Sequence, residues 1–165
     1  MAELEEGATL TVSGVVNAPG LGIFPGGPVN PDIPKAMGLV GVPAWFWADD
    51  PGPGIGRAHT VSTTVADYTL AATVIFRKIV YDTGDGILEC RNLGDDPGGR
   101  IHEPTIPPRG CYHVYEHKGL YHVTATTYFD VEWTGAGQHG VITGLTVQRE
   151  ADYRIGEIQV LIVNP

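Results

Sequence analysis

The clearest pattern in the sequence is an alternation of apolar and polar positions over residues 121–133. One set of alternate positions is mainly apolar and comprises Tyr121, Val123, Ala125, Thr127, Phe129, Val131 and Trp133. The intervening positions, from His122 to Glu132, are mainly polar. A period of two residues is that of a β-strand, and the polar set predicts that one face of this strand meets water.

A similar alternation over residues 68–76 predicts a second strand, which we expect to end in a turn at Arg77-Lys78. Shorter apolar runs between clusters of Gly, Pro and Asp predict the remaining strands. They cover residues 8–16, 38–48, 59–65, 79–81, 87–90, 110–115, 140–149 and 155–163. We detect no helical period in any segment. Short strands at this spacing predict an all-β fold, an antiparallel β-sandwich.

Residues 17–35 interrupt this pattern, because they contain five prolines and several glycines. Proline has no backbone N–H to donate, so such a segment is irregular and extended. We therefore interpret residues 1–37 as an extended Pro/Gly-rich arm that leans on the sandwich or reaches a neighbouring subunit. The alternative is that this segment contributes an edge strand to the same domain. Residues 38–165 are expected to form the sandwich itself.

The composition agrees with many turns and few helices, since the chain has 23 Gly and 13 Pro. Charged residues make up 18% of the chain, below the usual ~25%. The formal charge of −9 argues against binding to nucleic acid or to anionic membrane surfaces, which need a basic face. No run approaches the ~20 apolar residues that span a bilayer, so we expect no membrane insertion.

The two cysteines, Cys90 and Cys111, predict one disulfide bond and hence an oxidising compartment. Two buried free thiols are the alternative. The first residues are acidic, where a signal peptide would be basic and then apolar. Two routes out of the cytoplasm are therefore open: removal of a signal before Met1, or release by cell lysis, as for a virion protein. We expect a secreted or cell-surface location, with a virion surface as the variant.

Two segments carry a resemblance to a known family. The turn Tyr81-Asp82-Thr83-Gly84-Asp85-Gly86 resembles the Trp-Asp-Phe-Gly-Asp-Gly signature of PKD (polycystic kidney disease) domains, from which Tyr81 and Thr83 depart. Residues 112–124 look like the His-x-Tyr-x-x-x-Gly-x-Tyr-x-Val-Thr segment of the same domains.

Further positions are similar to exported PKD-like proteins of actinobacteria: Pro43-Ala44-Trp45-Phe46-Trp47, the two cysteines, Trp133 and Glu157-Ile158-Gln159-Val160-Leu161. The resemblance covers residues 38–163. It implies an immunoglobulin-like β-sandwich outside the cytoplasm, and it implies no catalytic residues.

Candidate chemistry in the chain has a structural reading in each case. Asp82-Thr83-Gly84 spells the nucleophile triplet of aspartic proteases, but such enzymes need two carboxylates that share a proton, and the triplet occurs once. The six histidines are scattered, and no cysteine or carboxylate completes a zinc-like set with them. The acidic loops at residues 49–50, 82–85 and 95–96 follow no known calcium-loop spacing. We expect no metal and no cofactor.

The adjacent aromatic residues Trp45, Phe46 and Trp47 give the best candidate for a contact with a ligand or partner. On a strand, neighbours point to opposite faces, so at least one of the three should lie outside the sandwich core. An exposed ring of this kind can stack on a sugar or anchor a protein. The alternative is that the N-terminal arm covers it.

These patterns favour a non-enzymatic extracytoplasmic module, or a subunit of an extracellular or virion assembly, that acts through protein–protein contacts. Its partner would be another protein or copies of itself. A monomeric module that binds a surface glycan or a protein is the alternative function, and an aspartic-type hydrolase is a remote one.

Overall fold

The computed structural model describes residues 2–13, 16–30, 32, 37–57, 59–65, 67–98 and 105–158 of the chain. Among these residues, a single helix, α1 (Ala2–Ser13), precedes all strands. The strands are β1 (Gly20–Phe24), β2 (Gly38–Leu39), β3 (Pro43–Asp49), β4 (His59–Val65), β5 (Tyr68–Asp82), β6 (Ile87–Cys90), β7 (Tyr112–Val114), β8 (Gly119–Gly135) and β9 (Gln138–Gly156). In the described portion of the chain, no helix is long and apolar enough to cross a membrane.

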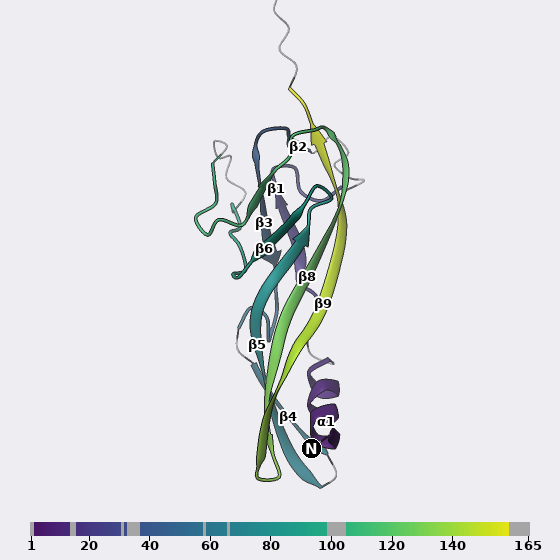
Figure 1. Ribbon diagram of the computed structural model, residues 1–165, viewed down its shortest axis with the longest axis vertical. Coiled ribbons are helices and arrows are strands. Elements are labelled where there is room, and N and C mark those ends of the chain that lie inside the picture. The colour runs from purple at the N-terminus through teal and green to yellow at the C-terminus, as the bar shows by residue number, and fades with distance from the viewer. Residues whose placement is uncertain are drawn as a thin grey trace, which may run out of the picture.

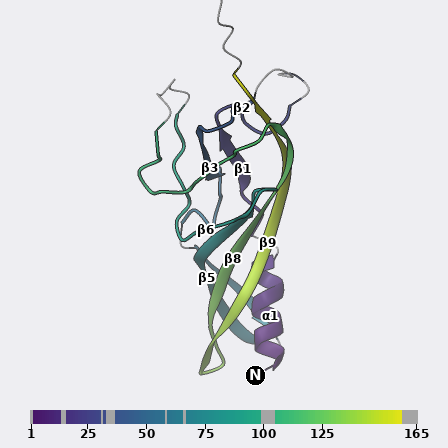
Figure 2. The same ribbon diagram turned by 45° about the horizontal axis from the view of Figure 1, so that its top comes forward.

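The strands form two sheets of very different size. The small sheet has three strands in the order β1-β3-β7, and the large sheet has six, in the order β2-β9-β8-β5-β4 with β6 beside β5. All pairings are antiparallel except that of β2 with the end of β9. In Figure 1 the strongly twisted strands β5, β8 and β9 run along most of the molecule. The small sheet lies beside their upper half and α1 beside their lower half (Figures 1 and 2).

The upper half holds one hydrophobic core between the two sheets. The small sheet contributes Leu21, Ile23, Ala44 and Phe46, and the large sheet contributes Ile79, Tyr81, Val123, Ala125, Tyr153 and Ile155. The alternation along each strand directs these side chains to one face. Both cysteines and Tyr115 belong to the same core, so the end of the long disulfide loop takes part in the packing.

The lower half holds a second core under α1. Leu4, Ala8 and Val12 recur every four residues, which places them on one face of a helix, and all three are buried. They pack against inward-facing side chains of β5 and β8, which include Leu70, Ala72, Val74, Phe129, Val131 and Trp133. The prediction of a strand over residues 8–16 is therefore wrong, and so is the expectation that the start of residues 1–37 is extended. Apolar residues two positions apart in the sequence were interpreted as one face of a strand. In the structure, apolar residues four positions apart form the buried face of the helix.

The rest of the proline-rich segment supplies β1, which pairs with β3 at the edge of the small sheet. The turn predicted at Arg77-Lys78 is also wrong. Strand β5 continues through this point with a β-bulge between Phe76 and Lys78. The strands predicted at residues 140–149 and 155–163 both fall on the single strand β9, but the second overlaps it only at residues 155–156. Residues 157–158 are not part of a strand, and residues 159–163 lie outside the described residues.

The antiparallel, mainly β architecture is confirmed. The finer expectation of an immunoglobulin-like sandwich stays a prediction. The small sheet lies over only one half of the large sheet, and a helix packs on the other half.

Candidate functional site

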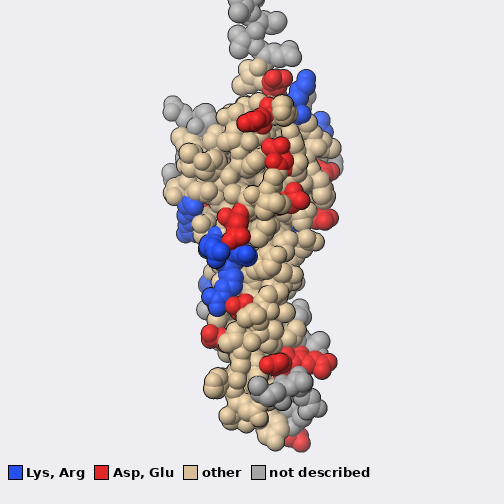
Figure 3. Space-filling model, viewed as in Figure 1, with Lys and Arg blue, Asp and Glu red and all other residues tan. Residues whose placement is uncertain are grey.

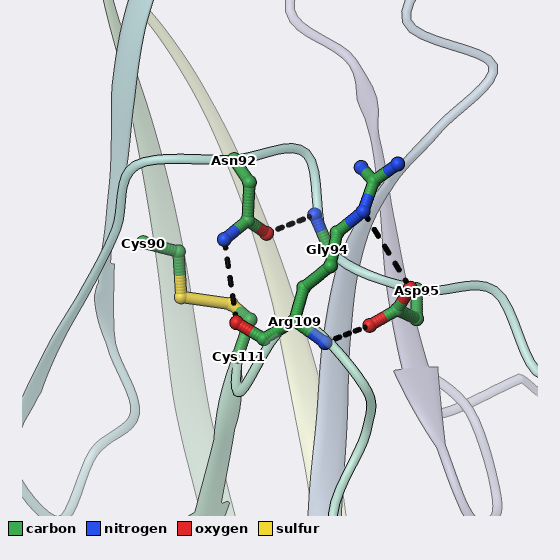
Figure 4. The surroundings of a disulfide bond; sticks show 6 residues. All are labelled: Cys90, Asn92, Gly94, Asp95, Arg109 and Cys111. Atoms are coloured by element: carbon green, nitrogen blue, oxygen red, sulfur yellow. Dashed lines mark hydrogen bonds and ion pairs between the residues drawn. A yellow bond between two sulfur atoms is a disulfide. The ribbon is translucent and has the colours of Figure 1, made fainter.

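The predicted disulfide joins Cys90 at the end of β6 to Cys111 just before β7. The Cα atoms are 5.7 Å apart, within the usual range for a bridge. Figure 4 shows how further contacts close the base of the loop between the cysteines. Asn92 accepts a hydrogen bond from Gly94 N at 2.8 Å, and Asp95 accepts one from Arg109 N at 2.8 Å. The Arg109 guanidinium also lies 3.7 Å from the Asp95 carboxylate.

The loop between the two cysteines contacts the small sheet and packs against two of its tryptophans. Trp45 is 7% exposed, and its indole N–H donates to the carbonyl of Thr105 in the loop at 2.7 Å. The ring of Trp47 lies against Gly22 of β1, and its Cα and Cβ lie against Gly94 of the loop, so closely that a Cβ at either glycine would overlap Trp47. Phe46 points the other way, into the upper core, and is fully buried.

The aromatic contact surface predicted from the sequence is therefore wrong for Trp45 and Phe46. Trp47 is half-buried, and its indole N–H is buried without an acceptor among the described residues. Both the loop and β1, which belongs to residues 1–37, contribute to the cover. Trp47 is therefore the one residue of the three that keeps partial exposure.

The turn at Asp82–Gly86 links β5 to β6 and is held by its own side chains. The carboxylate of Asp82 accepts a hydrogen bond from Gly84 N at 3.0 Å. The buried Thr83 hydroxyl donates to Gly86 O at 2.8 Å and accepts from Asp85 N at 3.2 Å. Positive φ angles at Gly84 and Gly86 allow the tight reversal. The Asp-Thr-Gly triplet thus has a structural role in this turn.

A cluster of three tyrosines contacts this turn. The hydroxyl of Tyr115, which is buried, donates to Thr83 O at 2.8 Å. Its ring packs against Tyr121 and Tyr153, with ring centroids 4.5 and 5.7 Å away. Burial raises the pKa of Tyr115 and Tyr153 far above the usual value, so both hydroxyls stay protonated and act as donors. Tyr153 donates to Pro25 O at 2.6 Å and so joins β9 to the segment after β1.

Two histidines form pairs with carboxylates at the surface. His113 contacts Asp85 of the turn at 2.8 Å, and His122 contacts Asp152 across β8 and β9 at 2.9 Å. The hydrogen bond with Asp152, helped by the nearby charge of Glu150, raises the pKa of His122 above its usual value. Among the residues that the structure describes, no group of three or more His, Cys, Asp or Glu side chains is placed to hold a metal ion.

Charged side chains in the middle of the large sheet form ion pairs with one another. Figure 3 shows Lys and Arg beside Asp and Glu at this height. Arg77 pairs with Asp130 at 2.7 Å, and Glu89 of β6 pairs with both Lys78 and Arg91, at 3.3 and 2.9 Å.

A pocket of about 520 Å³ lies where the start of β1, the end of β3 and β9 meet. Its lining includes Asn17, Asp49, Asp50 and Arg149. The Arg149 guanidinium donates to the carbonyl of Ala18 at 2.8 Å, so some of its hydrogen-bonding capacity holds the pocket wall. The lining combines polar side chains with Pro51 and Pro53, and its two carboxylates, Asp49 and Asp50, belong to one of the acidic loops singled out in the sequence.

The large sheet ends at β9 and the short β2 on one side and at β4 and β6 on the other, and these edges differ in how well they are protected. The upper portion of β9 is covered, because Asp152 O accepts from Val29 N at 2.7 Å and β2 pairs with its end. The lower portion of β9 contains a bulge at Thr143-Gly144, a feature that blocks strand addition. In the described structure, β4 pairs with β5 on one side and makes no main-chain hydrogen bond on the other.

Comparison of the chain with protein-family models, with known proteins and with solved structures finds no match.

Proposed function

We propose that this chain is a non-enzymatic module that works outside the cytoplasm through protein–protein contacts, as a surface component or as a subunit of an extracellular or virion assembly. In this proposal the upper half is a PKD-like, immunoglobulin-like sandwich. The bonded turn Asp82–Gly86 and the contact from Tyr115 to Thr83 support that assignment, because both lie in the segments that resemble PKD domains.

The observation that carries the proposal is the open edge of the large sheet along β4. An unpaired edge presents main-chain N–H and C=O groups to a strand from another chain. The bridge between Cys90 and Cys111 supports an oxidising location, because cytosolic thiols are kept reduced.

The proposal is tested in the cells or particles that produce the protein. Free thiols are alkylated before lysis, and the mass of the peptides with Cys90 and Cys111 then reports whether they were bridged. In parallel, a chemical cross-linker is added before lysis. We expect a bridged protein and cross-linked species heavier than the 17.6 kDa chain. Reduced cysteines, or a chain that never cross-links, would overturn the proposal.

A second candidate function, a monomeric glycan-binding module, is favoured by the pocket beside β1. Carboxylate, amide and guanidinium groups line it, and these groups hydrogen-bond to sugar hydroxyls. A glycan array with the wild type and the Asp50→Ala variant tests this candidate. Binding that is lost in the variant would support it, and an empty array would exclude it.

A further inference from the structure

Strand β4 has the sequence His-Thr-Val-Ser-Thr-Thr-Val and contains no Asp, Glu, Lys or Arg and no proline. Most of its residues are β-branched, and such residues favour extended strands. Natural proteins usually protect an edge strand with a charge, a proline or a bulge. All seven residues of β4 pair with β5 in unbroken register, so none of these protections is present in it.

We propose that β4 pairs with β4 of a second copy of this chain, antiparallel and about a two-fold axis at Ser62. This inference rests on the proposed function, since it names the partner of the open edge. With the axis at Ser62, every residue of β4 faces a residue of the other copy, and Thr60 lies opposite Thr64 of that copy. The two large sheets then become one continuous sheet.

The side chains of β4 fit this arrangement. Thr60, Ser62 and Thr64 alternate along the strand and therefore share one face of the sheet. Within one chain, Thr60 and Thr73 already form an exposed cross-strand hydrogen bond of 2.7 Å between their hydroxyls. Threonine pairs across the two-fold axis repeat this contact, and cross-strand pairs of this kind stabilise a sheet.

Charge explains why a copy of the same strand is acceptable here. In a two-fold antiparallel pair, the central residue faces itself, so a charged residue there would face a like charge. Strand β4 avoids this because Ser62 is uncharged. By contrast, the upper portion of β9 carries Arg149, Glu150, Asp152 and Arg154.

The charges elsewhere in the lower half repel a second copy and so weaken the pairing slightly. Neither α1 nor residues 59–76 nor residues 129–148 contain Lys or Arg, whereas Glu5, Glu6, Asp67 and Glu132 are acidic. Figure 3 accordingly shows acidic but no basic side chains at the lower end of the visible face. Two such ends repel each other, and salt screens this repulsion. The dimer should therefore become tighter as the salt concentration rises.

The test is sedimentation equilibrium of the oxidised full chain up to about 1 mM, the range that a small interface requires. We expect a mass of two chains. Ser62→Lys and Ser62→Glu place like charges at the axis, and each should raise the dissociation constant by about tenfold or more. An equimolar mixture of the two variants should recover the dimer, because the opposite charges then face each other.

The chain offers a matched control. Thr134 of β8 lies in the same row of the sheet, since Ser62 is opposite Ala71 and Ala71 is opposite Thr134. Thr134 is exposed, but it lies on a strand that is paired on both sides. Thr134→Lys adds the same charge to the same face and should leave the dimer intact.

Four outcomes would overturn the pairing: a monomeric wild type, a dimer that Ser62→Lys leaves intact, a mixture that does not reassociate, or an equal effect of Thr134→Lys. A monomer in solution that still cross-links to another protein where it is produced would refute self-pairing alone. The proposed function would fail if that cross-linking also failed or if the two cysteines proved to be reduced.

Discussion

The disulfide should supply a large and measurable share of the stability of the fold. Cys90 and Cys111 are 21 residues apart in sequence, and closing a loop of this length restricts the unfolded chain. In the chain-entropy treatment this restriction is worth about 3 kcal/mol. The usual free energy of unfolding of a domain is only about 5–15 kcal/mol. Replacing both cysteines by alanine should therefore destabilise the protein severely without abolishing the fold.

Alanine is the appropriate replacement because both sulfur atoms lie in the upper core, where the two cysteines are 4% and 1% exposed. A serine hydroxyl would be buried there without a hydrogen-bond partner. The free-energy cost of burying it would then be added to the effect of losing the disulfide. For a chain of this size, 1 kcal/mol corresponds to a shift of roughly 2–4 °C in melting temperature, so we expect a decrease of roughly 6–12 °C.

The assay is equilibrium unfolding in guanidinium, followed by circular dichroism and with or without reductant. Reductant should destabilise the wild type by about the same 3 kcal/mol and leave the double alanine variant unchanged. Tryptophan emission gives a local measure, because Trp45 donates to Thr105 in the loop that the bridge closes. A difference below about 1 kcal/mol would refute the reasoning, since the unfolded chain would then already keep the loop ends together.

Three further predictions follow from single side chains. Tyr115→Phe removes a buried hydroxyl donor and should lower the free energy of unfolding by about 1–3 kcal/mol in a denaturant titration. Tyr121→Phe should lower it less, because the hydrogen bond of the Tyr121 hydroxyl is exposed. Equal losses in the two variants would contradict this. Gly94→Ala should destabilise far more than Gly98→Ala, because both have positive φ but only the Cβ at Gly94 meets the backbone of β3; similar melting temperatures would contradict it. The raised pKa of His122 means that its pairing stabilises the fold below about pH 6.5 and that this contribution is lost as pH rises through the folded pKa. An NMR titration midpoint at or below about 6.5 would contradict it.

The sequence predicted elements best where one pattern dominates a segment. Strands β4 and β6 were predicted with the bounds that they have, and β8 lacks only its end residues. Each has a clear alternation or is bounded by strong turn formers, so local preference and tertiary packing agree. The disulfide was also predictable, because two cysteines leave one pairing.

Helix α1 was missed because Ala8, Leu10 and Val12 have the spacing of a strand, while Leu4, Ala8 and Val12 have that of a helix face. Which pattern is used depends on the surface offered by β5 and β8, which lies far away in sequence. The cover over Trp45 and Trp47 was unpredictable for the same reason. It comes from Gly22 and from the loop around Gly94 and Thr105, and no local pattern connects these residues.

The misplaced turn at Arg77-Lys78 shows how the two halves of the molecule are joined. Along β5 the buried positions are Leu70, Ala72 and Val74, then Ile79 and Tyr81, so the inward phase slips by one residue. A slip of this kind is what a bulge produces when the strand itself continues.

Strand β8 has no slip, because its odd-numbered positions from Val123 to Trp133 stay buried throughout. Each neighbour of β8 therefore carries one extra residue at the same height, in β5 after Phe76 and in β9 at Thr143-Gly144. Asp130 of β8 contacts both bulges, since its carboxylate accepts a hydrogen bond from Arg77 at 2.7 Å and another from Gly144 N at 3.3 Å. Because bulges increase local twist, this point lets one continuous sheet turn its inner face from the small sheet in the upper half to α1 in the lower half. The open edge of β4 belongs to the lower half, away from the disulfide, so the bridge can stabilise the upper core and leave that edge free for a partner.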